Sequence, residues 1–165
     1  MKQYEELELQ YDFMFGKVMM KKELCRQMLE RVLGEPIGEI EYPDAQKTLS
    51  ISAGSKSVRL DVYVMDEKKR VYDSEMQRRA PSDDELPKRS RYYQGVMDLN
   101  LIQKGANYSS LNESYVIFIC TFDPFGQGLG KYTFQNICLE RRDLIMGDQT
   151  TNVYSGKCEP HARTF

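Results

Sequence analysis

Apolar residues recur at helical spacing in two stretches of the chain. The first runs from about Asp12 to Leu33, where Gly34 and Pro36 follow and end the pattern. The second covers residues 88–104. Each stretch is long enough for an amphipathic helix, so we expect two helices that each turn one apolar side toward a core.

Short runs rich in β-branched and aromatic residues lie between and after these helices. The expected strands are residues 48–52, 58–65, 71–77, 115–120 and 131–139. The charged loop 66–70 predicts an antiparallel hairpin, and the continuous apolar run 115–120 is typical of a strand covered on both faces. This order of elements predicts an α/β fold with a mixed β-sheet flanked by helices.

The length and composition predict that the chain forms a single globular domain. Its 165 residues are 41% hydrophobic and 29% charged, as in globular proteins that bury about 70% of their unfolded surface. We expect this domain over residues 1–154, followed by a tail at 155–165 that suggests a shortened chain. The sequence contains neither a signal peptide nor an apolar run long enough for a membrane span, which predicts a cytoplasmic protein.

Few side chains in this sequence suit catalysis. The four cysteines are widely separated and predict neither a zinc site nor a disulfide framework, and the single histidine, His161, lies near the end of the chain. Carboxylates, amides, amines or a metal ion therefore carry any chemistry. The net charge of −2 disfavours broad coating of nucleic acid, whereas the basic residues between positions 78 and 91 allow a local phosphate contact.

The predicted hairpin brings two carboxylates together. If Met65 and Val71 close its loop, Asp61 lies opposite Glu75 with Cβ atoms about 5 Å apart. One face of the hairpin is then apolar. The other face gathers Asp61, Asp73, Glu75 and Gln77. Such a carboxylate pair suits Mg²⁺, which takes oxygen ligands and keeps water for a substrate phosphate, and Gln77 can orient an attacking water.

Two other interpretations fit the same pattern. Acids and amides are common on the solvated outer face of an antiparallel hairpin, which needs no site at all. A retaining glycosidase also uses two carboxylates about 5 Å apart, but the chain has no tryptophan to form a platform for a sugar ring. The sequence pattern alone therefore does not exclude the interpretation as a solvated face without a site.

Several ordered blocks of the sequence resemble one known family. The run VRLDVYVMDEKKRVYDSEMQ is similar to the D…E-x-Q signature of the recombination-promoting nuclease and transposase family, a branch of the PD-(D/E)xK nuclease superfamily. The other similar blocks are YDFMFGKVM, KRSRYYQGVMDLNLIQKGANYSSL, YVIFICTFDPFG, KYTFQNICLE and GDQTTNVY. The resemblance covers residues 11–154 and implies a restriction-endonuclease-like fold.

The resemblance also implies a function, that of a DNA endonuclease dependent on Mg²⁺ or Mn²⁺ and linked to recombination or mobile elements. Asp61 and Glu75 would be metal ligands and catalytic residues, together with Gln77, which stands where the superfamily usually has lysine. An amide cannot supply that positive charge. The alternative is therefore a catalytically weakened DNA-binding or assembly domain of the same fold.

The start of the second helix has two interpretations. Arg89, Arg91, Tyr92 and Tyr93 would bind DNA by contacting phosphates and stacking near the site, or they would form an exposed face with tyrosines packed on the sheet. DNA is the expected partner, a second copy of the chain is a further candidate, and a membrane is not expected.

Overall fold

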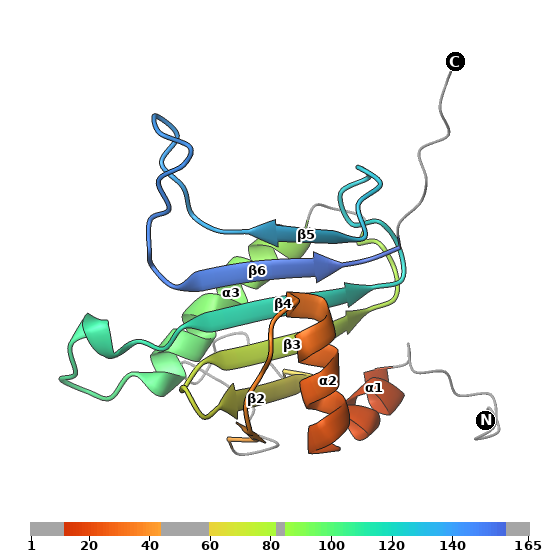
Figure 1. Cartoon of the computed structure of the whole chain (residues 1–165), viewed down its shortest axis with the longest axis horizontal. Coiled ribbons are helices and arrows are strands. Elements are labelled where there is room, and N and C mark those ends of the chain that lie inside the picture. The colour runs from red at the N-terminus through yellow and green to blue at the C-terminus, as the bar shows by residue number, and fades with distance from the viewer. Residues whose placement is uncertain (1–11, 44–59, 82–84, 158–165) are drawn as a thin grey trace.

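The structure is a computed structural model that describes residues 12–43, 60–81 and 85–157 (Figure 1). The helices are α1 (Asp12–Met19), α2 (Lys22–Leu33), α3 (Glu85–Leu101) and the short 3₁₀ helix η2 (Tyr108–Ser110). The strands are β1 (Ile40–Glu41), β2 (Val62–Asp66), β3 (Val71–Gln77), β4 (Ser114–Cys120), β5 (Lys131–Phe134) and β6 (Thr150–Ser155).

One mixed sheet of six strands forms the centre of the fold. Its strand order is β1-β2-β3-β4-β6-β5, in which β3, β4 and β6 are parallel and the other neighbours pair antiparallel. Helices α1 and α2 cover one face, and α3 covers the other (Figure 1). The predicted α/β fold, with a mixed sheet between helices, is confirmed.

Strand β4 is central, as its continuous apolar run predicts. It lies between β3 and β6, and its side chains are packed on both faces of the sheet. Ile117 joins the core under α1 and α2, whereas Val116 and Phe118 join the core under α3. Alternate residues of one strand therefore support two separate hydrophobic cores.

The first predicted helix is divided in two. Lys21 has an extended backbone between α1 and α2, which interrupts the helical pattern. Both pieces pack on the same face of the sheet, where Met19 from α1 and Cys25 from α2 join one core. Gly34 ends α2 as predicted, because its left-handed backbone conformation lets its N–H bond the carbonyl oxygen of Glu30.

The structure adds two strands to those predicted. Strand β1 has only two residues, too few for an alternating pattern, and pairs with the end of β2. Strand β6 lies parallel to β4 and antiparallel to β5, although the sequence prediction assigned no strand there. The strand predicted at 48–52 lies outside the described residues, and the one predicted at 131–139 ends at Phe134.

A buried aspartate fixes the turn of the β2–β3 hairpin. One oxygen of Asp66 accepts hydrogen bonds from the backbone N–H groups of Lys68 and Arg70, and the other accepts them from the Arg70 side chain and the Tyr72 hydroxyl. Asp66 is 3% exposed, so these bonds stabilise its charge in the core. The turn residues thereby set the register of the two strands.

Helix α3 begins earlier than predicted and is anchored to the sheet by a buried amide. It starts at Glu85, and Pro87 lies in its first turn, where a missing N–H removes no intrahelical bond. The Ser114 hydroxyl donates to the Gln94 side-chain oxygen at 2.6 Å, and the Gln94 amide donates to the carbonyl oxygen of Thr151 at 3.3 Å. These bonds hold α3 against β4 and β6.

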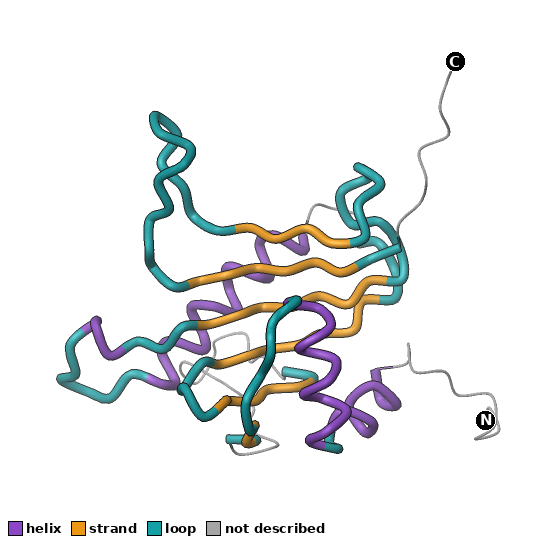
Figure 2. Tube along the Cα trace, viewed as in Figure 1, coloured by secondary structure: helices purple, strands orange, loops and turns teal. Residues whose placement is uncertain are grey.

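The segment between β5 and β6 leaves the edge of the sheet as a projecting arm (Figure 2). Its exposed large apolar side chains are Ile137, Leu139, Leu144, Ile145 and Met146. None of the helices within the described ranges is long and apolar enough to cross a membrane. Cys25, Cys120 and Cys138 are free thiols, and Cys158 lies outside those ranges.

Candidate active site

The hairpin register brings Asp61 against Glu75. Tyr63 pairs with Asp73 and Val62 with Ser74, as the sequence pattern predicts. One residue beyond this ladder, the backbone N–H of Asp61 donates to a Glu75 carboxylate oxygen at 2.9 Å. The N–H of Met76 donates to an Asp61 carboxylate oxygen at 3.3 Å. Each carboxylate thus accepts a bond from the backbone of the opposite strand.

This acidic face of the hairpin is buried beneath α3. Asp73 is 0% exposed and Glu75 is 4% exposed, so the interpretation as a solvated outer face is wrong. Leu60, predicted on the opposite face with Val62, also packs toward α3, because it precedes β2 and does not follow its alternation. Periodicity identified α3 as amphipathic but could not show which face of the sheet it covers.

Burial and mutual repulsion raise the proton affinity of two carboxyls. Burial raises the pKa of Asp73 well above its usual range, and the negative charge of Glu75 adds to the effect. Burial, followed by repulsion from Asp61, raises the pKa of Glu75 to about 7. Apart from the neighbouring Glu75 carboxyl, no donor in the described part of the chain reaches the oxygens of Asp73. Both neighbouring carboxyls therefore hold a proton to higher pH than a free carboxylic acid does.

Arg89 reaches into the site from the first half of α3. Its guanidinium donates to the Gln77 side-chain oxygen at 2.9 Å, to the Tyr93 hydroxyl at 3.1 Å and to a Glu75 oxygen at 3.4 Å. The Gln77 amide nitrogen donates in turn to the carbonyl oxygen of Arg79 at 2.7 Å. Both ends of the Gln77 amide are thereby engaged within the protein.

Asp61, Glu75, Gln77 and Arg89 form one cluster beside the mixed sheet. Glu75 and Gln77 lie on β3, Asp61 directly precedes β2, and Arg89 lies on α3. A model of the PD-(D/E)XK nuclease family transposases matches residues 9–143. The chain belongs to this family. The resemblance stated from the sequence blocks and the restriction-endonuclease-like fold are thereby confirmed. No protein of curated function and no solved structure gives a significant match.

The two carboxylates have the donor chemistry that a divalent metal ion in a PD-(D/E)XK nuclease requires. Glu75 on β3 and Asp61, which directly precedes β2, offer hard oxygen ligands. Within the described ranges, no group of three His, Cys, Asp or Glu side chains is arranged to hold an ion. Mg²⁺ commonly takes only one or two protein carboxylates and completes its shell with water and phosphate oxygens. The pair therefore suits this ion.

Tyr93, one of the residues predicted near the site, and Phe118, which was not predicted, complete the surroundings of Arg89. The Arg89 guanidinium lies over both rings, 5.5 Å from the centroid of Tyr93 and 5.0 Å from that of Phe118. Tyr93 follows Arg89 by four residues on the same helix, so this contact could be predicted from the sequence spacing. The contact with Phe118 on β4 depends on how the helix packs, which local spacing does not reveal.

Arg91 and Tyr92 lie on a different side of α3 from Arg89. Arg91 is exposed and Tyr92 half-buried, and with Lys88 they line a hollow of about 310 Å³ on the helix. Of the four residues predicted near DNA, the structure brings only Arg89 into hydrogen-bonding contact with a site carboxylate, Glu75, within the described ranges. Arg91 remains placed for a phosphate that approaches the outer side of α3.

Replacing Arg91 with glutamine is expected to weaken DNA binding by about two- to tenfold on every sequence, because a lost phosphate contact carries no base information. The slope of log K against log salt should become shallower by about one unit. Fluorescence anisotropy with two unrelated duplexes over a salt series measures both effects. Arg142→Gln on the projecting arm is the matched control, and an unchanged slope in Arg91→Gln would assign this residue to the surface alone.

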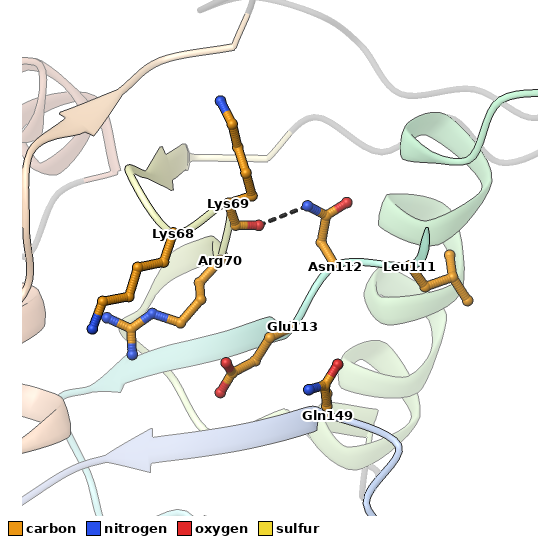
Figure 3. Close-up of a pocket in the computed structure, with 7 residues that line it drawn as sticks. All are labelled: Lys68, Lys69, Arg70, Leu111, Asn112, Glu113 and Gln149. Atoms are coloured by element: carbon orange, nitrogen blue, oxygen red, sulfur yellow. Dashed lines mark hydrogen bonds between the residues drawn. The ribbon is translucent and has the colours of Figure 1, made fainter. Parts of the chain in front are cut away.

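A second hollow lies beside the turn of the β2–β3 hairpin (Figure 3). This turn is at the opposite end of the hairpin from Asp61 and Glu75. Its volume is about 400 Å³, and it is lined by Lys68, Lys69, Arg70, Leu111, Asn112, Glu113 and Gln149. The Asn112 amide donates to the carbonyl oxygen of Lys69, which joins the hairpin turn to the segment before β4. Glu113 is the one acid among these lining residues, and its carboxylate accepts a hydrogen bond from the Tyr115 hydroxyl at 2.6 Å.

Proposed function

We propose that the chain is a DNA endonuclease that hydrolyses phosphodiester bonds with Mg²⁺ or Mn²⁺, in recombination or in the movement of mobile elements. The observation that carries the proposal is the Asp61–Glu75 pair, in which each carboxylate is oriented by the backbone of the opposite strand. Membership of a nuclease family of transposases supports the same reaction. Asp61 and Glu75 are the proposed catalytic residues, and Gln77, whose amide is engaged at both ends, would support them from the motif position.

Asp61 and Glu75 would hold the ion, and DNA would approach along the rim between the hairpin and α3. When bound, the ion would orient the scissile phosphate, acidify a water and stabilise the charge of the transition state. The backbone bonds to both carboxylates keep them at fixed positions, which limits the reorganisation needed during the reaction. Arg91 and Tyr92 would contact the DNA backbone on the outer side of α3.

A plasmid-nicking assay tests this proposal. The wild-type protein is expected to nick supercoiled DNA with Mg²⁺ or Mn²⁺ and not with EDTA, and Glu75→Gln should abolish the activity. Glu140→Gln, which neutralises an exposed acid on the projecting arm, is the control for the loss of one carboxylate. Metal-independent nicking, or equal nicking by Glu75→Gln, would contradict the proposal.

The raised pKa of Glu75 predicts a pH dependence of metal binding. Glu75 must lose its proton to bind an ion, so the proton competes with the metal below a pH of about 7. The apparent affinity for Mn²⁺ should fall by about tenfold per pH unit below this value and level off above it. Titration calorimetry between pH 5.5 and 8.5 measures this profile, and Glu140→Gln should share it. An affinity that is flat across the range would show that Glu75 is not a ligand.

A second candidate function, DNA binding or assembly without cleavage, is favoured by one observation. The position of the motif lysine holds Gln77, a neutral residue. If cleavage is absent while sequence-independent DNA binding and Mn²⁺ binding persist, this second function is the correct one.

A further inference from the structure

The site of this chain contains a positive charge, although the motif position does not. Gln77 stands where a PD-(D/E)xK nuclease usually has lysine, and an amide carries no charge. The guanidinium of Arg89 lies 2.9 Å from the side-chain oxygen of Gln77 and 3.4 Å from an oxygen of Glu75. A cation from α3 is thus present at the end of the side chain that replaces the lysine.

We propose that Arg89 supplies from α3 the positive charge that the motif lysine supplies from the strand, and that Gln77 is the positioning residue that holds Arg89 there. This inference rests on the proposed nuclease function. It differs from the sequence interpretation of Arg89 as a general contact to DNA phosphates, because it assigns the guanidinium to the reacting phosphate itself.

The surroundings of Arg89 hold its guanidinium in one orientation. Its side chain is 25% exposed, and the guanidinium lies over the rings of Tyr93 and Phe118 while it also donates to the Tyr93 hydroxyl. Cation–π contacts of this kind are stronger when they are partly desolvated. A planar guanidinium held by two rings and two hydrogen bonds can present its remaining N–H groups in fixed directions.

Gln77 has the contacts expected of a residue that positions Arg89. Its amide nitrogen donates to the carbonyl oxygen of Arg79, which turns the amide oxygen toward the guanidinium. A lysine at this position would place a second cation beside Arg89. Glutamine on the strand and arginine on the helix therefore form a matched pair, in which the amide accepts the hydrogen bond and the guanidinium carries the charge.

The contact between Arg89 and Glu75 leaves room for substrate. At 3.4 Å it is the longest of the three bonds that the guanidinium donates, so it is the one most readily exchanged for a phosphate oxygen. In hydrolysis, the water oxygen bonds to phosphorus and the bond from phosphorus to the leaving oxygen breaks. The water loses a proton to solvent, and the leaving oxygen gains one. Arg89 stays protonated and donates to the phosphate oxygens where negative charge grows.

Moving the charge back to the strand tests the inference. Arg89→Gln is expected to lower kcat by about 10²- to 10³-fold with a smaller change in KM for DNA, as when one preorganised donor to a transition state is removed. The double variant Gln77→Lys/Arg89→Gln should recover at least about tenfold of this loss, because the lysine restores a cation at the motif position. Arg142→Gln is the control for the loss of an exposed guanidinium and should retain the wild-type kcat.

Two further readouts separate damage to the fold from loss of the charge. Arg89→Lys keeps a cation without the planar fork, so its kcat should lie between those of the wild type and Arg89→Gln. The rise in melting temperature with Mn²⁺ should persist in Arg89→Gln, because neither proposed ligand is changed. Wild-type kcat in Arg89→Gln, or a double variant no faster than Arg89→Gln, would overturn this inference alone. A wild-type protein that neither cleaves DNA nor gains stability from Mn²⁺ would overturn the proposed function and the inference together.

Discussion

Asp61→Asn is expected to lower the rate of metal-dependent cleavage by about 10³-fold, since a metal-bound transition state loses several kcal/mol of stabilisation when a ligand is lost. The substitution should not harm the apo protein. Asparagine retains an oxygen that can accept the bond from the Met76 N–H, and it removes a negative charge that repels Glu75. Loss of function and preservation of the fold are thus expected in the same variant.

Single-turnover cleavage with Mn²⁺, together with thermal melting in EDTA, measures both parts of this prediction. Asp143→Asn is the matched control, because Asp143 pairs with Arg141 on the exposed arm, where both side chains are more than two-thirds exposed. It should change neither quantity. If Asp61→Asn retains the wild-type cleavage rate, Asp61 is not a ligand, and if it unfolds in EDTA, the carboxylate has a structural role instead.

Asp73→Asn is expected to stabilise the protein at pH 8 by about 1–3 kcal/mol, the usual range for a buried polar group without adequate partners. Asp73 is 0% exposed, and within the described ranges only the Glu75 carboxyl, itself an acid, lies within hydrogen-bond reach of its oxygens. Asparagine has nearly the same shape and carries no charge. Its amide can also donate to the neighbouring Glu75.

The direction of the pH dependence follows from the raised pKa of Asp73. Because the pKa is higher in the folded protein than in the unfolded chain, folding favours the protonated acid. This contribution is complete below the unfolded pKa of about 4 and is lost as pH rises toward the folded pKa. The advantage of Asp73→Asn should therefore grow from pH 5 to pH 8. Urea unfolding at several pH values measures it, and an advantage that is constant or shrinks with pH would contradict the buried-acid account.

The register of the hairpin could be predicted from sequence because two local signals agree. Alternation in β2 and β3 assigns the faces, and the charged turn limits where the strands can pair. The opposition of Asp61 and Glu75 follows from these signals alone. Strand β6 was missed because its residues were considered only as a block of family resemblance, although the pair of threonines followed by Val153 and Tyr154 is typical of a strand.

The burial of the acidic face and the inward direction of Arg89 could not be predicted in this way. Both depend on α3 packing against the face that carries Asp73 and Glu75, a contact between segments separated by a loop. Periodicity shows that a helix has an apolar side, but the choice of face is decided by the whole sheet. For the same reason Arg89 and Arg91, two residues apart, were assigned one role and lie in different surroundings.

The most direct test of the carboxylate pair as a metal site is a melting curve with and without millimolar Mn²⁺, recorded for the wild type and for Asp61→Asn. An ion that binds only the folded state at ten times its dissociation constant adds about 1.4 kcal/mol of stability, or about 3–6 °C for a chain of this size. The account predicts this rise in the wild type and little or none in Asp61→Asn. Equal shifts in the two proteins would contradict it.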